Sequence, residues 1–537
     1  MSRRSSRRPA AADPTTLARS SPPRDDLVGR QEVLGLLEQA IDEAIRGRGG
    51  LVLLTGDPGI GKTAVASRAT DHAAAGGARV LWASCWEGEG VPGYWPWLQV
   101  LRVLIAQVDT KVEEVSATAP LLTRLLRGAT AAEHQADLGN EPAERVRFQL
   151  FDEVASFLVE QAVSRPLVVV FDDLHWADPA SVLLIDFLAR RLHTFPLLVI
   201  GTCREIEVSV DSPLASLLAG GAATTLALLP LSAAEVRSVM ARVLSREPEP
   251  ELAAAAHRMT AGNAFLVHQV ARLLLTSSDG KELLRRGDIP EGVLEAVQRR
   301  LSRLSEQCRD LLEVASVLGP ESAAERIASL SGRSVGTVRD LLVEATRAHI
   351  LADPMEPLGR YRFTHDLFRE SIYRSLSAVA RARLHLAAGR ALVAERAARG
   401  DVTLAELASH FVRAAEVGGQ EDALHYSGLA AVEATRRLAY EEAAGHWERA
   451  LAVQEAWAPG ELGDRCEILL ELADAHRRSG NLVAAQATYR RAAEPSCWRR
   501  WSPGLERTRW GQPSLASGRR HCSSRETARR CWRSLLR

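Results

Sequence analysis

Short apolar runs alternate with helical patterns in the first half of the chain. The run at 51–55 is continuously apolar and has glycines on both sides, which favours a buried strand over a helix. Apolar residues at helical spacing separate this run from the later ones, as over 62–75. Strands that alternate with helices predict a parallel sheet with helices on both faces. The remaining predicted strands are 79–83, 166–171, 196–201 and 225–229.

The strand pattern nearly disappears after residue 230. Residues 231–290 have the spacing of short helices, and 291–375 add further helices with one β-like piece at 361–364. From 376 to 494 the chain is a series of Ala-rich helical pairs with weak self-similarity. Small residues that recur on one helix face allow close pairing, which is typical of tetratricopeptide-like repeats. Generic packing of Ala-rich helices is the alternative.

The two ends of the chain differ from the rest. Residues 1–25 are rich in Arg, Ser and Pro, which predicts a disordered tail. Residues 495–537 are basic, contain no Lys and lack hydrophobic periodicity. This segment has two interpretations: a disordered basic arm for nucleic acid, or an out-of-frame read of GC-rich bacterial DNA. Our hypothesis is the second, a frameshifted or truncated copy near Pro495.

Composition indicates which partners and which cellular compartment to expect. The formal net charge is zero, so no overall field attracts nucleic acid. Seven cysteines without CxxC pairs argue against a zinc site or a disulfide framework and fit a reducing cytosol. No apolar run approaches the ~18 residues of a membrane span, and the basic N-terminus lacks the apolar region of a signal peptide. The sequence therefore predicts a cytoplasmic protein without a membrane partner.

A phosphate-binding loop follows the first predicted strand. Residues 56–63 fit the pattern G-x-x-x-x-G-K-[ST] between a strand and a helix. The glycines let backbone N–H groups face phosphate oxygens, and the helix directs its N-terminal dipole at the anion. We expect Lys62 to reach the β- and γ-phosphates and Thr63 to ligate Mg²⁺. The nucleotide-binding candidates in this loop are Gly56, Asp57, Pro58, Gly59, Ile60, Gly61, Lys62 and Thr63.

Carboxylates after the predicted strand at 166–171 supply the second half of a phosphoryl-transfer site. We expect Asp172 to bind Mg²⁺, directly or through water, and Asp173 to orient or deprotonate the attacking water. A pair of turn aspartates that cap the next helix is the structural alternative. Arg204 follows another strand, where parallel strands line a ligand crevice, so it is either a γ-phosphate sensor or a surface arginine. The catalytic candidates are Lys62, Asp173 and Arg204.

Taken together, these motifs resemble the STAND class of signal-transduction ATPases, in particular bacterial large LuxR-type ATP-binding regulators. Residues 56–63 match the class motif G-x-P-G-I-G-K-T, and 172–178 match D-D-L-H-W-A-D. Residues 27–30 resemble the leading V-G-R motif that lies by the adenine, although Gln31 replaces the usual acidic residue. The resemblance implies that Val28, Gly29 and Arg30 contact the nucleotide.

Three later segments extend this resemblance. Residues 201–204 resemble the sensor strand of the class, and 260–265 are similar to T-G-G-N-P-F with Ala264 in place of the Pro. Residues 363–370 are similar to the winged-helix segment F-x-H-D-L-x-R-E. By analogy, His365 either touches the β-phosphate of bound ADP or is a structural histidine.

The resemblance implies an α/β P-loop NTPase core followed by an all-α lid, a winged-helix subdomain and α-helical repeats. The expected boundaries of these units are 26–230, 231–290, 291–375 and 376–494. The given sequence lacks the pattern of the C-terminal helix-turn-helix that such regulators often carry. We therefore expect DNA binding only if an output domain is supplied elsewhere.

The implied function is a nucleotide-dependent switch in transcriptional regulation, with ATP or ADP and Mg²⁺ as cofactors. ADP would hold the core, lid and winged helix closed, and ATP with a signal on the repeats would open them. The inducer or protein partner on the repeats is not specified, and nucleotide-dependent self-association is kept open. A slow hydrolysis step would reset the switch. Two alternatives are a remodelling ATPase of the Orc or AAA type and a helical-repeat scaffold with a structural nucleotide.

Overall fold

The computed structural model describes most of the chain between its two ends. The predicted tails at 1–25 and 495–537, His365 and the segment 277–297 lie outside the described residues. Within the described part, no helix combines the length and apolar composition that a membrane span requires. The described residues are 27–85, 91–108, 118–127, 142–204, 208–209, 212–276, 298, 300–352, 359–364, 366–399, 402–457 and 462–493.

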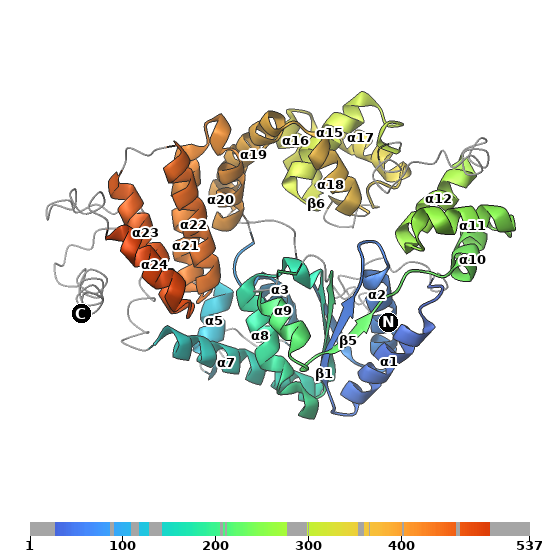
Figure 1. Cartoon of the computed structure of the whole chain (residues 1–537), viewed down its shortest axis with the longest axis horizontal. Coiled ribbons are helices and arrows are strands. Elements are labelled where there is room, and N and C mark those ends of the chain that lie inside the picture. The colour runs from blue at the N-terminus through green and yellow to red at the C-terminus, as the bar shows by residue number, and fades with distance from the viewer. Residues whose placement is uncertain are drawn as a thin grey trace, which may run out of the picture.

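A five-stranded parallel sheet forms the centre of the N-terminal unit (Figure 1). The strand order is β2-β3-β4-β1-β5, and all neighbouring pairs are parallel. The carboxyl ends of β1, β3 and β4 therefore lie side by side at one edge. This confirms the predicted fold class, and each predicted strand agrees with an observed one to within two residues. The strands are β1 (Gly50–Thr55), β2 (Arg79–Ser84), β3 (Leu167–Asp172), β4 (Leu197–Cys203) and β5 (Thr224–Ala227).

Helices cover both faces of this sheet because alternate strand residues point to opposite sides. Val52 and Leu54 pack with α1 (Gln31–Ile45) and α2 (Lys62–Ala75) in one buried cluster. Leu53 and its equivalents on other strands face a second, larger cluster on the other side. The helices of the N-terminal unit that contribute to the larger cluster are α3 (Trp95–Val108), α5 (Pro120–Arg127), α7 (Ala143–Ser164), α8 (Pro179–Ala189) and α9 (Pro213–Ala219).

Two small units follow the sheet. The three-helix unit has its own apolar cluster, and a capping box of Ser232 and Glu235 begins its first helix. The winged-helix-like unit combines helices with a two-stranded antiparallel sheet, whose strands are separated in the chain by two of those helices. The sequence predicted β7 but not β6, since β6 is only three residues long and mostly polar or small. The elements are α10 (Ala233–Leu244), α11 (Pro250–Thr260), α12 (Ala264–Thr276), α15 (Glu306–Leu318), β6 (Glu321–Ala323), α16 (Ala324–Ser331), α17 (Val335–Arg347), β7 (Arg360–Arg362) and α18 (Asp366–Ser375).

The remaining helices stack in chain order and turn back toward the N-terminal unit (Figure 1). Alanines at the facing surfaces, such as Ala431, Ala443 and Ala450, are fully buried. Their small side chains allow adjacent helices to pack closely, as in helical repeats. These repeat helices are α19 (Ala378–Arg399), α20 (Leu404–Arg413), α21 (Gln420–Arg436), α22 (Tyr440–Trp457), α23 (Leu462–Arg478) and α24 (Leu482–Ala492).

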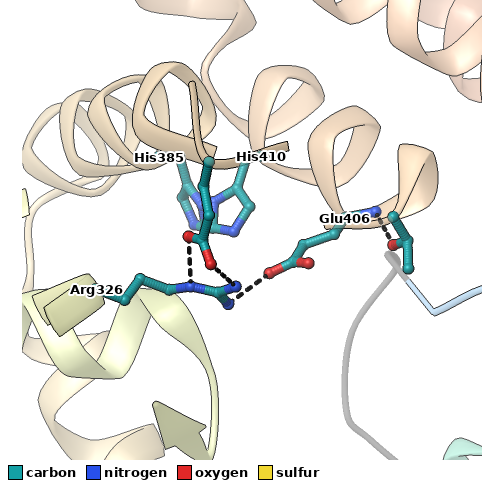
Figure 2. A network of polar contacts seen from close by, with 6 residues as sticks. Arg326, His385, Glu406 and His410 are labelled. Atoms are coloured by element: carbon teal, nitrogen blue, oxygen red, sulfur yellow. Dashed lines mark hydrogen bonds and ion pairs between the residues drawn. The ribbon is translucent and has the colours of Figure 1, made fainter. Parts of the chain in front are cut away.

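Arg326 joins the winged-helix-like unit to the first repeat helices (Figure 2). Its Nε and Nη2 donate to Glu395 of α19 at 3.1 and 2.9 Å, and its Nη1 donates to Glu406 of α20 at 3.2 Å. Close to this network, Nδ1 of His385 and Nδ1 of His410 lie 3.0 Å apart. Burial lowers the pKa of these histidines to about 2 and about 3, so both rings are neutral and one donates to the other.

We expect Arg326→Ala to lower the free energy of unfolding by about 1–3 kcal/mol. The change removes the cation that pairs with both carboxylates, which costs about 3–5 kcal/mol when such a pair is fully buried and under about 1 kcal/mol at the surface. These side chains are 22–27% exposed, so an intermediate effect follows. Urea denaturation would measure it. Arg339→Ala, which removes a more exposed pair with Glu325, is the control. Equal effects of the two variants would contradict the prediction.

Candidate nucleotide site

A cavity of about 400 Å³ lies where three units of the fold meet. The N-terminal unit, the three-helix unit and the winged-helix-like unit all contribute to its wall. Its volume lies within the ~300–1,000 Å³ range of small-molecule sites. The part of its wall next to the carboxyl edge of the sheet carries Lys62, Asp172, Asp173 and Arg204 and is called the polar end here, while Val28, Leu231 and Val239 give the wall an apolar part. This combination suits a ligand with one charged and one apolar part.

The loop after β1 forms the floor of the polar end. Residues 59–63 line the cavity, and Lys62 begins α2. Gly61 has φ +109° at the N-cap of this helix, a left-handed conformation that favours glycine. Gly56 passes so close to Leu228 that an added Cβ would lie 2.9 Å from its carbonyl oxygen. Glycine is thus required at both ends of the loop, and the N-terminus of α2 faces the cavity.

Lys62 is held over this loop by its own backbone. The Nζ donates to the carbonyl oxygens of Gly56 at 2.8 Å and Asp57 at 3.0 Å. Burial lowers the pKa of the Lys62 ammonium, while the negative charge of Asp173 opposes that shift. A cation in this position, 6% exposed, is suited to bind phosphate oxygens in place of the loop carbonyls.

Asp172 joins three parts of the chain at the sheet edge. Its Oδ1 accepts hydrogen bonds from the hydroxyls of Thr63 at 2.8 Å and Thr202 at 2.7 Å. The Thr202 hydroxyl also accepts the N–H of Asp173 at 2.8 Å, which fixes the turn after β3. Asp173 itself has φ +59°, a strained conformation for a residue other than glycine. Its placement at the cavity wall is therefore enforced by the surrounding contacts.

The donor set at this edge fits Mg²⁺. The hydroxyl of Thr63 and the carboxylate of Asp172 are hard oxygen ligands, and they lie 2.8 Å apart beside the loop. Mg²⁺ is usually held by one or two protein oxygens together with phosphate oxygens and water. Thr63 and Asp172 would hold the ion when a nucleotide is bound.

Arg204 lies at the same polar end. It follows β4 directly and lines the cavity. Burial lowers the pKa values of Lys62 and His175, and the positive charge of Arg204 lowers both further, so the three groups share one electrostatic environment. Burial is the main cause that lowers the pKa of His175 to about 3, which keeps this imidazole neutral. The structure thus brings together Lys62, Asp173 and Arg204, the three residues predicted to be catalytic.

The N-terminal segment 27–30 contributes to the apolar part of the wall. Val28 lines the cavity with Leu231 and Val239. Arg30 also lines it, but its guanidinium donates to the carbonyl oxygens of Leu229 at 2.7 Å and Ile60 at 3.0 Å. Those bonds tie the segment to the phosphate-binding loop and to the chain after β5.

Four of the residues predicted to contact the nucleotide do not line the cavity. Gly29 has φ +72°, and an added Cβ would lie 2.2 Å from Oε1 of Glu235, so this glycine permits close packing against α10. Gly56, Asp57 and Pro58 support the loop instead, through carbonyl oxygens that accept hydrogen bonds. His365 lies outside the described residues.

Several residues of the site were not predicted from the sequence. Asn263 Nδ2 donates to the Pro58 carbonyl at 2.8 Å, and the Phe265 N–H donates to the Gly59 carbonyl at 3.0 Å. The three-helix unit therefore holds the phosphate-binding loop directly. The motif at 260–265 was the sequence signal for this contact. The winged-helix-like unit also lines the cavity, with Glu321, Arg362, Phe363, Thr364 and Arg369.

Solved structures with similar folds include ATPases from archaea. A signal transduction ATPase with numerous domains and a tetratricopeptide repeat sensor from Pyrococcus horikoshii is 19% identical, with a TM-score of 0.47, and covers 88% of this chain and 65% of its own. A Walker-type ATPase of Pyrococcus abyssi is 14% identical, covering 65% and 97%, with a TM-score of 0.31. The Orc1 protein of Aeropyrum pernix, solved in complex with DNA, is 16% identical, covering 65% and 94%, with a TM-score of 0.31.

Sequence comparison identifies the N-terminal unit. An uncharacterized protein of Rhizobium meliloti (strain 1021) is 25% identical over 455 residues, which cover 79% of this chain and 42% of that protein. The chain therefore spans less than half the length of this relative. Residues 26–200 match the family model described as AAA ATPase domain. That range includes the phosphate-binding loop, Asp172 and Asp173. The protein therefore contains an AAA ATPase domain.

Proposed function

We propose that the protein is an ATP-binding signal-transduction ATPase that acts as a nucleotide-dependent switch in transcriptional regulation. The observation that carries this proposal is the cavity shared by the AAA domain, the three-helix unit and the winged-helix-like unit. One nucleotide bound there would contact all three units at once. Its γ-phosphate would then change how well the units fit together, which is the differential affinity that a switch requires.

The chemistry of the switch is slow ATP hydrolysis. Lys62 binds the β- and γ-phosphates, and Thr63 and Asp172 would hold Mg²⁺, which would neutralise charge on the phosphates. Asp173 orients a water for attack on the γ-phosphorus and accepts its proton as the bond to the ADP oxygen breaks. Arg204 responds to the presence of the γ-phosphate. The positions of these groups around one end of the cavity support these assignments.

The free energy that a complete switch requires is larger than the γ-phosphate alone would supply. Moving a population from 1:99 to 99:1 takes about 5.5 kcal/mol of differential binding. One γ-phosphate that gains a charge-assisted hydrogen bond contributes about 1.5–3 kcal/mol. A signal bound to α19–α24 would supply the remainder. DNA enters this proposal only through an output domain supplied elsewhere.

The test is to denature the purified protein and identify the released nucleotide by chromatography, together with the ATP turnover rate. We expect retained ADP and turnover on the order of 10⁻⁴–10⁻² s⁻¹, the range of switch NTPases without a partner. Turnover above about 1 s⁻¹ by a stable ring would favour a remodelling motor instead. The absence of any affinity for adenine nucleotides with Mg²⁺ would show the proposal to be wrong.

A further inference from the structure

We propose that Asn263 is a positioning residue, which holds the phosphate-binding loop in the shape that binds phosphate without touching the nucleotide itself. This inference rests on the proposed function, because it concerns the affinity of that same nucleotide site. Asn263 directly precedes α12 of the three-helix unit, and its Nδ2 donates to the Pro58 carbonyl at 2.8 Å. Asn263 does not line the cavity, so its effect on a bound phosphate passes through the loop.

Every carbonyl oxygen from residue 56 to residue 60 accepts a hydrogen bond. The first two accept from the Lys62 ammonium, which belongs to the loop itself. The next three accept from outside the loop at 2.8–3.0 Å, and their donors are the Asn263 amide, the Phe265 N–H and the Arg30 guanidinium. When Lys62 turns to a phosphate, its two bonds to the loop are lost. The outer donors are then the ones that keep the loop in shape.

The Asn263 bond sets the direction of the Gly59 N–H. A trans peptide unit directs its N–H opposite to its carbonyl, so a Pro58 carbonyl that faces Asn263 directs the Gly59 N–H to the other side. Since Gly59 lines the cavity and Asn263 does not, this N–H points toward the site of the phosphates. Gly59 has φ +74°, and a glycine leaves such a conformation easily unless an external bond holds it. The bond to the carbonyl also polarises the peptide unit, which makes its N–H a stronger donor.

A strained turn places Asn263 against the loop. Ala261 has φ +46° and Gly262 has φ +74°, so two consecutive residues are left-handed just before Asn263. An added Cβ at Gly262 would lie 2.2 Å from the Leu231 carbonyl oxygen, and the Gly262 carbonyl accepts the Leu231 N–H at 2.8 Å. Such a conformation is costly for an alanine and persists only where surrounding contacts enforce it. The turn is thus fixed against the chain that follows β5, and Asn263 reaches the loop from a rigid base.

Asn263 also has an ordinary structural role, which an experiment must separate from the first. Its Oδ1 accepts the N–H of Leu266 at 3.3 Å, the bond of an N-cap in the first turn of α12. Serine is as good an N-cap as asparagine, but it lacks the amide donor and its side chain is shorter. Glutamine keeps the amide donor but is not a favoured N-cap. Two substitutions without charge therefore remove the two roles one at a time.

The test compares the binding of ADP and of adenosine to Asn263→Ser and Asn263→Gln in the full chain, by competition with a fluorescent ADP analogue. Adenosine lacks phosphates, so the ratio of the two affinities isolates the contribution of the phosphate-binding loop. We expect Asn263→Ser to weaken ADP binding about three- to tenfold, the size of one hydrogen bond, and to change adenosine binding by less than about twofold. Asn263→Gln should keep more of the ADP affinity. Asn481→Ser, the same change at the N-cap of α24, is the control and should alter neither affinity.

Hydrogen–deuterium exchange of the nucleotide-free protein separates the inference from the proposed function. The amides of 56–63 should exchange faster in Asn263→Ser than in the wild type, because the loop loses an external bond, while those of β1 should not change. An unchanged ratio of the two affinities, or unchanged exchange of the loop, refutes the inference. If the wild-type protein binds no ADP, the proposed function is wrong, and exchange alone then decides whether Asn263 holds the loop.

Discussion

Lys62→Ala is expected to weaken binding of ADP and ATP by about 10²–10⁴-fold. The Nζ of Lys62 is placed by the Gly56 and Asp57 carbonyls at the floor of the cavity, where it would contact two phosphate groups. Each charge-assisted hydrogen bond is worth about 1.5–3 kcal/mol, and tenfold in affinity corresponds to about 1.4 kcal/mol. Titration of a fluorescent ADP analogue in the presence of Mg²⁺ would measure the change.

A basic residue elsewhere on α2 provides the control for this variant. Arg68 belongs to the same helix but does not line the cavity, so Arg68→Ala should bind nucleotide as the wild type does. If Lys62→Ala keeps wild-type affinity, the assignment of 56–63 as the phosphate-binding loop fails. If it loses nucleotide but still transmits a signal through the repeats, the scaffold alternative is favoured.

Asp172→Asn is expected to reduce ATP hydrolysis by at least about 10²-fold while ADP binding persists. An amide of the same shape still accepts hydrogen bonds from the hydroxyls of Thr63 and Thr202, so the sheet edge should keep its geometry. It lacks the negative charge that a carboxylate offers to Mg²⁺, and losing one preorganised electrostatic group typically costs about 10²–10³ in rate. Phosphate release at several Mg²⁺ concentrations would measure both effects.

The neighbouring carboxylate gives a matched comparison. Asp173→Asn should slow hydrolysis to a similar degree, because Asp173 is assigned to the attacking water, but it should leave the Mg²⁺ dependence unchanged. The two variants together distinguish the metal-holding role from the water-orienting role. An unchanged Mg²⁺ dependence in Asp172→Asn would contradict the assignment of that residue.

The sequence by itself determined the local elements of the nucleotide site. Its apolar runs correspond to the strands, because a buried strand such as β1, β3 or β4 needs a short, continuous apolar stretch. The phosphate-binding loop was recognisable because its chemistry is contiguous: the glycines, Lys62 and Thr63 lie in one strand–turn–helix unit. Asp172 was recognisable for the same reason, since it ends a fully buried strand. Both predictions depended only on residues that are close in the chain.

Tertiary structure alone decided which distant residues complete the site. The strand order places β4 between β1 and β3, so Thr202 reaches Asp172 and fixes the turn at Asp173. Packing of separate units also brings Asn263 to the phosphate-binding loop, and it places Glu442 against Gly93. None of these contacts leaves a periodic signal, because each depends on how units far apart in the chain pack together. Local periodicity specifies the elements, whereas burial of their apolar faces against one another specifies their neighbours.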